Sequence, residues 1–490
     1  MQHSSIKSNL FRKETNMKRI ISVLLIVFLI LTSGCRKGKS DDENELYALA
    51  LAMVLFTTTD DCDTGNVTVS AYKDSPFGIF GPYEFEVDRI SAGFTKYDAN
   101  HYLLDIGAKW IQVKYCDENS VPGEIQTYGR VGKEGLADTT RITDLYRNQL
   151  REVIRLHKDR TKYWEAGTEP DGFPPPMGWK GRPDAYAEFL KETYLVIKSE
   201  CSECKVIFGG IGGIGATTGL DSAPAVFLKE VLTAGGGKYI DGFAFKQHRY
   251  NAGDYQLIKN RMDDYSGVFS DFGIDLRSMP VFLETATHDG YPNSTSEYLS
   301  LFPIKAQTEK EQAMGLFKMY IYSAVQGVSK IFWNLIFERY NFGNDPGSDF
   351  NFYGLVNNPL NDGVNYPKLA YYTYKKMAEV LEGADWKNIQ TVQESGDIYV
   401  YRFTKGERII HVAWWDYFND PSYTAGMTKD TVIGALSGVT VTKTEAVPMF
   451  SSGKDVTDYG NAFKKNTVDI VSGSVTMSLG EEPVFVETDP

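Results

Sequence analysis

Short apolar runs alternate with amphipathic stretches from about Ser70 to Leu381. This alternation is typical of β-strands that are each followed by a helix in a parallel sheet. The clearest apolar runs predict strands at Phe77–Phe80, Trp110–Val113, Tyr163–Ala166, Val206–Phe208, Gly242–Phe245, Val281–Glu284 and Lys330–Asn334. The amphipathic stretches predict helices, for example at Thr143–His157, Ala185–Lys198, Ala225–Ala234 and Lys310–Val325.

An eighth strand is expected within Ser120–Val131, where the pattern is weakest. Eight strand–helix units fit a closed (β/α)8 barrel better than an open doubly wound sheet, since barrels of about 250 residues with insertions are common. We therefore predict a TIM barrel over residues 70–384, which ends with an aromatic-rich helix at Lys368–Leu381.

The pattern changes after Trp386, where short alternating runs follow one another with only Gly, Ser, Asn and Asp turns between them. The runs are IYVYRF, RIIHVAWW, VTVTKTEAV, TVDIVS, SVTMSL and PVFVET. No helical periodicity separates them, so they predict an all-β domain over residues 385–490, with a β-sandwich as its architecture.

The N-terminal part of the chain has the pattern of an export signal. From Met17, two basic residues precede an uninterrupted apolar run at Val23–Leu31, and small residues then lead to Gly34 and Cys35. This order is typical of a secretory signal peptide, here residues 1–34. The apolar run is shorter than the ~20 residues that a membrane-spanning helix needs.

The small residues directly before Cys35 resemble the lipobox of bacterial lipoproteins, in which a peptidase cuts before the cysteine and the thiol is lipidated. The resemblance implies that Cys35 carries a lipid and that residues 35–69 form a tether with a short apolar segment. The protein would then be exported and anchored in the bacterial envelope, at the outer membrane or the cell surface. The alternatives are plain secretion, with Cys35 as an ordinary thiol, and an uncleaved anchor.

Composition excludes several other classes of protein. With 42% hydrophobic and 23% charged residues, the chain has the make-up of an ordinary globular protein rather than a disordered one. The 51 Lys and Arg against 64 Asp and Glu give a net charge of −13. A chain this acidic repels a phosphate backbone, so nucleic acid is not expected as a partner.

The cysteines and glycines predict structure rather than a cofactor site. Cys201 and Cys204 lie between a predicted helix and a predicted strand, not at the start of a helix, so they predict a structural disulfide rather than a redox motif. No second CxxC or HxxxH motif offers the further ligands that zinc needs. The glycine-rich stretch Gly209–Gly215 lacks the GK[ST] ending of a phosphate-binding loop. We therefore expect no metal and no organic cofactor.

Polar side chains stand at the ends of the predicted barrel strands, where barrel enzymes carry their catalytic groups. Glu169 follows the fourth strand and Glu284 ends the seventh, while His248 and Tyr250 follow the sixth and Trp333 lies in the eighth. The two glutamates are about three strand–helix units apart, so they can face each other across a barrel. A facing pair of carboxylates is what glycoside hydrolysis requires, one to protonate the leaving oxygen and one to attack the sugar or activate water.

The order of these residues resembles that of the clan A glycoside hydrolases, retaining barrel enzymes that include cellulases, β-mannanases and β-xylosidases. Their fourth strand ends in Asn-Glu-Pro, matched here by Thr168 to Pro170, and their sixth strand carries a His-x-Tyr motif. The resemblance implies that Glu169 is the acid/base and Glu284 the nucleophile. The residues that it implies for sugar binding are Thr168, His248, Tyr250 and Trp333.

Two positions depart from the family pattern. Thr168 stands where the family has the Asn that binds the sugar 2-hydroxyl, and the Arg of the second strand is absent, with Gln112 or Lys114 available instead. Glu165 is a competing carboxylate on the fourth strand.

Two functional hypotheses therefore stay open. The first is a retaining hydrolase that acts on a β-linked oligo- or polysaccharide at the envelope. The second is a catalytically inactive, glycosidase-like lipoprotein that binds carbohydrate or a host or surface ligand. The first implies a carbohydrate partner, and both imply a membrane contact through the N-terminal lipid. A purely structural lipoprotein would leave the ordered set of polar residues unexplained.

Overall fold

The computed structural model describes residues 74–81, 96–114, 121–132, 144–172, 178–212, 219–220, 222–248, 251–290, 305–340 and 347–488. The chain divides into two units, Met1–Asp63 and Thr64–Pro490, and the described residues all belong to the second. The predicted signal peptide, Cys35 and Tyr250 lie outside the described residues.

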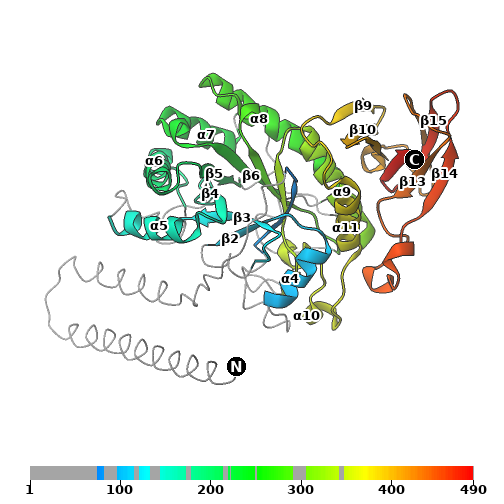
Figure 1. The fold of residues 1–490 in the computed structure, drawn as a ribbon, viewed down its shortest axis with the longest axis horizontal. Coiled ribbons are helices and arrows are strands. Elements are labelled where there is room, and N and C mark those ends of the chain that lie inside the picture. The colour runs from blue at the N-terminus through cyan, green and yellow to red at the C-terminus, as the bar shows by residue number, and fades with distance from the viewer. Residues whose placement is uncertain are drawn as a thin grey trace. The chain divides into compact units, whose positions relative to one another are not determined.

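Eight parallel strands close into a barrel in chain order (Figure 1). They are β1 (Phe77–Phe80), β2 (Trp110–Lys114), β3 (Gln126–Val131), β4 (Thr161–Ala166), β5 (Lys205–Ile211), β6 (Gly242–His248), β7 (Val281–Ala286) and β8 (Lys330–Trp333). The strand expected within Ser120–Val131 is β3, so the prediction of a TIM barrel is confirmed.

Most of the helices lie between successive strands, on the outside of the barrel, and the last two follow β8 (Figure 1). They are α4 (Lys96–Asp105), α5 (Asp144–His157), α6 (Pro183–Glu200), α7 (Ala223–Thr233), α8 (Leu257–Asp271), α9 (Glu309–Val325), α10 (Pro359–Asp362) and α11 (Leu369–Leu381). Because the helices cover one face of each strand and the barrel interior the other, the strands consist of nearly continuous apolar runs. Among the described residues, no helix is long and apolar enough to cross a bilayer.

Aromatic side chains fill the interior of the barrel. Phe80, Trp110, Tyr128, Phe282 and Phe332 are all buried and form one cluster with smaller apolar residues. The interior is therefore a packed core rather than an open channel.

The predicted disulfide between Cys201 and Cys204 is present and lies between α6 and β5. The structure therefore confirms the structural reading of this CxxC motif.

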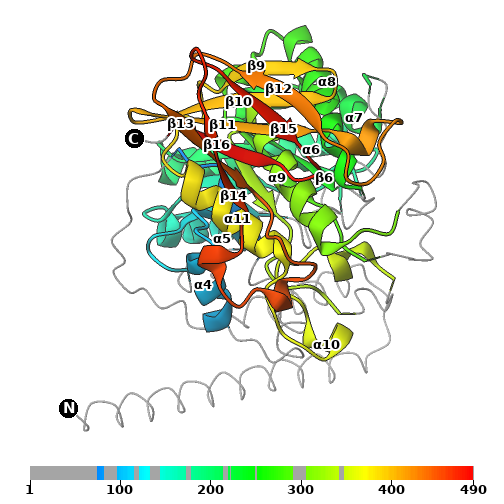
Figure 2. The ribbon, with the colours of Figure 1, turned by 90° about the vertical axis from the view of Figure 1, so that its right-hand side faces the viewer.

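The C-terminal residues form an all-β domain of antiparallel sheets, as predicted. One sheet has the order β14-β13-β16-β11-β10-β9, and β12 pairs with β15 in a second sheet (Figure 2). The strands are β9 (Gln390–Ser395), β10 (Ile398–Lys405), β11 (Arg408–Trp415), β12 (Lys429–Ile433), β13 (Thr440–Glu445), β14 (Lys465–Asp469), β15 (Val475–Leu479) and β16 (Val484–Thr488). The sequence did not predict β9, because this edge strand is almost wholly exposed and lacks the apolar alternation that reveals a strand. The short β12 was not predicted either.

The barrel and the β domain pack together through α9. A capping box of Thr308 and Glu311 begins this helix, and nearly all of its side chains are buried. Phe317 of α9 contacts Phe485 of β16, with 5.3 Å between the ring centres. The helix is apolar nearly all round because it is covered on both sides.

Candidate active site

The closed barrel brings the carboxyl ends of β4, β6, β7 and β8 to one end of the fold. Glu169 follows β4, Lys246 and His248 lie at the end of β6, Glu284 is in β7, and Asn334 follows β8. The structure therefore brings together three residues that the sequence predicted, namely Glu169, His248 and Glu284, with two that it did not.

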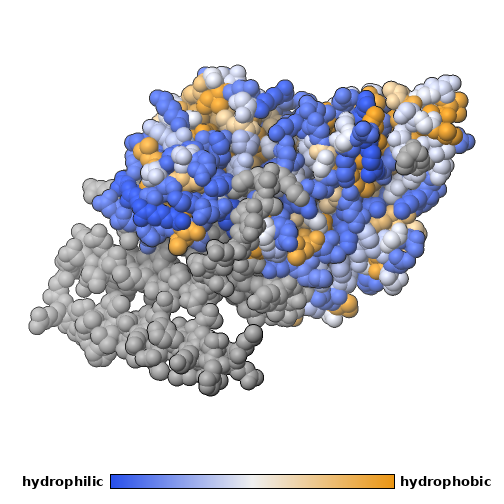
Figure 3. Space-filling model, in the orientation of Figure 1, coloured by the Kyte–Doolittle hydropathy of each residue, from blue (hydrophilic) through white to orange (hydrophobic). Residues whose placement is uncertain are grey.

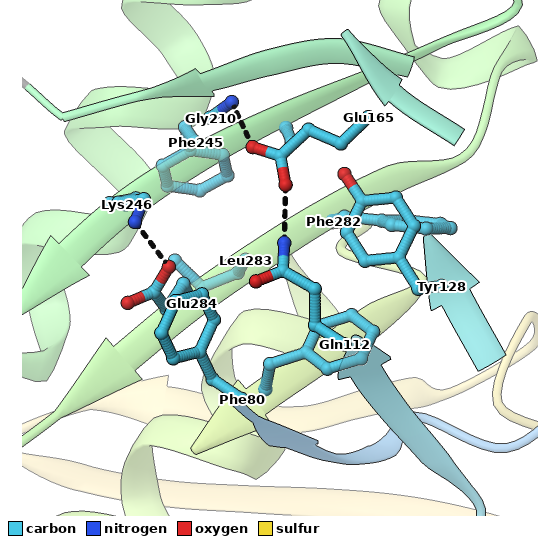
Figure 4. A pocket seen from close by; sticks show the side chains of 12 residues that line it. Phe80, Gln112, Tyr128, Glu165, Gly210, Phe245, Lys246, Phe282, Leu283 and Glu284 are labelled. Carbon is cyan, nitrogen blue, oxygen red and sulfur yellow. Dashed lines mark hydrogen bonds and ion pairs between the residues drawn. The ribbon is translucent and has the colours of Figure 1, made fainter. Parts of the chain in front are cut away.

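Glu284 is buried, and polar groups surround its carboxylate. Asn334 Nδ2 donates a hydrogen bond of 2.8 Å to Oε1, and His248 Nε2 lies 3.2 Å from the same oxygen. Lys246 Nζ lies 2.6 Å from the other oxygen, Oε2 (Figure 4). Both carboxylate oxygens are thus held from neighbouring strands, which fixes the direction in which Glu284 points.

Lys246 also joins Glu284 to Glu169. Its Nζ lies 3.5 Å from Glu169 Oε1, while Glu169 keeps about a quarter of its side chain exposed. One ammonium in contact with both carboxylates limits Glu169 Oε1 and Glu284 Oε2 to a separation of about 6 Å or less, near the 5–5.5 Å of retaining glycosidases and below the 6.5–9.5 Å of inverting ones. This upper bound is compatible with the spacing of a retaining pair.

The surroundings shift the pKa values of Glu284 and Glu165 in opposite directions. Burial would raise the pKa of Glu284, but the Lys246 ammonium and the bond to His248 outweigh it and lower the pKa to about 2. Burial raises the pKa of Glu165 to about 7, against the opposing charges of Lys246 and Arg130. Burial alone would lower the pKa of Lys246, but the neighbouring carboxylates of Glu284 and Glu169 raise it well above its usual value. At neutral pH the site therefore holds a charged Glu284–Lys246 pair beside a readily protonated Glu165.

Glu165 lies deeper in the barrel, at a small cavity that it shares with Lys246 and Glu284. Gln112 Nε2 donates to its Oε2, and the Gly210 amide donates a bond of 2.7 Å to Oε1 (Figure 4). The cavity volume is about 10 Å³, which is room for about one water molecule.

The backbone at Glu169 is strained. Its φ of 45° lies in the left-handed region that residues other than glycine rarely adopt. A hydrogen bond of 2.9 Å from the Glu169 amide to the Gly210 carbonyl holds this conformation, and a Cβ on Gly212 would lie 2.9 Å from Glu169 Cγ. A strained backbone conformation persists only where the surrounding contacts enforce it. Such conformations are concentrated at functional sites.

The remaining predicted site residues have different surroundings. Thr168 is buried, and its hydroxyl has no hydrogen-bond partner among the described residues. Trp333 is completely buried, and its indole nitrogen donates to the Tyr353 carbonyl at 3.0 Å. Trp333 therefore belongs to the core and presents no face on which a sugar could stack.

Neither Lys246 nor Asn334 was predicted as a site residue from the sequence. Alternate residues of a strand face the same side, so Lys246 shares the face of His248 two residues later, and this spacing was the available signal. Asn334 directly follows the last residue of β8, but one asparagine at a strand end carries no pattern of its own. Across the described parts of the chain, no cluster of three or more His, Cys, Asp and Glu residues could hold a metal ion.

The sequence matches no protein-family model and no curated protein. Solved structures are similar to it at low identity. A family 39 glycoside hydrolase from Bacteroides cellulosilyticus has a TM-score of 0.57 and 15% identity, covering 86% of this chain and 83% of that one. A family 51 α-L-arabinofuranosidase from Bifidobacterium longum has a TM-score of 0.54 and 12% identity, covering 86% and 98%. A family 30 endoxylanase from Clostridium papyrosolvens has a TM-score of 0.51 and 12% identity, also covering 86% and 98%. The chain is therefore structurally similar to the clan A (β/α)8 glycoside hydrolases, and it shares their fold.

Proposed function

We propose that this protein is a retaining glycoside hydrolase that acts on a β-linked oligo- or polysaccharide. The observation that carries the proposal is the contact of Lys246 with both Glu169 and Glu284, which limits their nearest oxygens to about 6 Å or less and so supports a retaining pair. The glycosidase-like barrel, with both groups at the carboxyl ends of its strands, supports it further.

In the proposed mechanism, Glu284 attacks the anomeric carbon, because it is the carboxylate that stays ionised at any ordinary pH. Asn334 and His248 hold Oε1, so the attacking oxygen in this mechanism is Oε2, which Lys246 contacts in this structure. Glu169 protonates the leaving oxygen and then, as a base, activates the water that releases the sugar from Glu284.

The test is hydrolysis of a panel of aryl glycosides by the wild-type protein, Glu169→Gln and Glu284→Ala. The panel includes β-xylosides and α-L-arabinofuranosides, because the similar structures include an endoxylanase and an arabinofuranosidase. We expect Glu169→Gln to lower kcat/KM about 10²–10⁴-fold on the substrate that is cleaved, and Glu284→Ala to lower it at least as much. Glu203→Gln, which changes an exposed glutamate that pairs with Lys162, is the matched control and keeps full activity. Full activity in either site variant would refute these roles.

A second candidate function is carbohydrate binding without hydrolysis. It is favoured by the position of Lys246, whose ammonium occupies the gap between the two carboxylates, and by the absence at Thr168 of the amide that the family uses. Binding of a sugar with no turnover on any member of the panel would support this candidate over the first.

We also propose that the protein is exported and anchored in the bacterial envelope through a lipid on Cys35. The support is the sequence pattern that ends at Gly34 and Cys35. Cells fed a traceable fatty acid should label the wild-type protein and not Cys35→Ser, and the variant should leave the membrane fraction. Equal labelling of both proteins would exclude Cys35 as the lipid site.

A further inference from the structure

Lys246 occupies the place that a reacting sugar has to enter. Its Nζ lies 2.6 Å from Glu284 Oε2 and 3.5 Å from Glu169 Oε1. In retaining hydrolysis the anomeric carbon and the leaving oxygen lie between these two carboxyl groups, each within about 3–3.5 Å of its partner. The ammonium and a bound glycoside therefore exclude each other, and the sugar-bound state needs Lys246 elsewhere.

Glu165 lies within reach of the same flexible side chain. A Cβ built on Gly210 would be 3.4 Å from Lys246 Cε and 3.2 Å from Glu165 Oε1, so the lysine stem and this carboxylate flank one point of β5. Lys246, Glu165 and Glu284 also line the same cavity. A rotation about the last bonds of Lys246 turns the ammonium from the gap toward Glu165.

The cavity beside Glu165 contains acceptors that lack a partner. Gln112 Oε1 and the Tyr128 hydroxyl are buried, and neither has a hydrogen-bond partner among the described residues. Both side chains line the cavity together with Glu165 (Figure 4). Leaving such groups unpaired in a buried place is unfavourable. One carboxylate and two neutral oxygens are a suitable set of partners for the three donors of an ammonium.

We propose that Lys246 is a positioning residue that exchanges between two places. In the empty protein its ammonium lies between Glu169 and Glu284 and offsets their mutual repulsion. When a glycoside enters, the ammonium moves to a receiving pocket formed by Glu165, Gln112 and Tyr128. The inference rests on the proposed function, because the ligand that displaces the ammonium is the same glycoside.

The test is a double-mutant cycle on the binding of hydrolysis-resistant, sulfur-linked aryl glycosides, measured by calorimetry. The proteins are the wild type, Glu165→Gln, Lys246→Met and the double variant. The titrations are run at pH 8, where Glu165, with its pKa of about 7, is mostly ionised. Glu165→Gln then removes the carboxylate that receives the ammonium, so it should weaken binding at least about tenfold in the wild-type background, since a buried ammonium without its carboxylate is costly. Lys246→Met leaves no ammonium to move, so Glu165→Gln should have no effect in that background.

The result that would overturn the exchange is an equal loss of affinity from Glu165→Gln in both backgrounds, or no loss in either. Where Glu165→Gln does not fold, Tyr128→Phe takes its place, because it removes only a hydroxyl of the receiving pocket. If the probes bind with the predicted coupling but no oxygen-linked substrate is cleaved, the proposed hydrolysis is refuted and the exchange of Lys246 is supported. If substrates are cleaved but the binding shows no coupling, the exchange is refuted and hydrolysis is supported. If no probe binds, both proposals are refuted.

Discussion

At the scale of single residues, the ionised state of Glu284 depends on one lysine. Burial alone would raise the pKa of this carboxyl, and Lys246 is the largest of the influences that lower it. The clan A pattern has an arginine on the second strand near this place, whereas here the positive charge comes from β6. The sequence predicted the two glutamates because they end buried strands. It could not predict Lys246, since a single lysine in a strand does not reveal which partners it faces.

Replacing Lys246 with methionine should therefore change the pH dependence of hydrolysis. Without the ammonium, the effect of burial is offset only by His248 and Asn334, so the pKa of Glu284 should rise from about 2 toward its ordinary value of 4.5. The nucleophile has to be ionised, so the acid limb of the kcat/KM profile should move to higher pH by at least about one unit. Profiles of the wild type, Lys246→Met and the control Lys162→Met check this, since Lys162 is a half-buried lysine that pairs with Glu203. An unchanged acid limb in Lys246→Met would contradict the role given to the lysine.

At the scale of elements, the glycine-rich end of β5 makes room for the carboxylates of β4. A Cβ on Gly209 would lie 2.6 Å from the Ala166 carbonyl oxygen, and Cβ atoms on Gly210 and Gly212 would crowd Glu165 and Glu169. This close packing gives the physical reason for a motif that the sequence had already distinguished from a phosphate-binding loop. It could not be predicted from the sequence, because it depends on how closely two neighbouring strands approach at one point.

Gly209→Ala should accordingly destabilise the barrel. The added methyl group meets the backbone of β4 and the Tyr186 hydroxyl, neither of which can move without disturbing the strand. We expect the free energy of unfolding to fall by about 1–3 kcal/mol, as measured by denaturant titration. Gly480→Ala, where a Cβ would meet nothing within 4 Å, should change it by about 0.5 kcal/mol or less. Equal effects of the two substitutions would contradict the close-packing account.

At the scale of the whole molecule, a buried charged pair joins the barrel to the β domain. Lys318 Nζ of α9 lies 3.9 Å from Asp416 Oδ1, with both side chains completely buried, and Gln256 donates a bond of 2.6 Å to the other oxygen of Asp416. The order of the two domains was predictable, because each has its own periodicity. Their docking was not, since neither Lys318 nor Asp416 stands out in its segment.

Hydrophilic residues cover most of the described surface in Figure 3, consistent with the acidic composition.

This pair should give stability a specific pH dependence. Burial lowers the pKa of Lys318 to about 8, although Asp416 opposes the shift. Between about pH 8 and 10 the unfolded chain keeps a proton on this lysine that the folded protein has lost, so the free energy of unfolding rises with pH over that range. Lys318→Met removes this contribution, and the wild type should gain about 1–3 kcal/mol relative to the variant from pH 8 to pH 10. A constant difference would contradict the shift, and Lys229→Met, at an exposed pair with Asp271, serves as the control.

The configuration of the sugar at the moment of release directly tests whether Glu169 and Glu284 act as a retaining pair. Proton NMR of the first-formed product, from the aryl glycoside that the protein cleaves fastest, distinguishes the two anomers before they equilibrate. With Glu169 and Glu284 held within about 6 Å of each other, we predict that the product keeps the configuration of the substrate. A product of inverted configuration, or no cleavage of any substrate, would contradict the assignment of these two glutamates as a retaining pair.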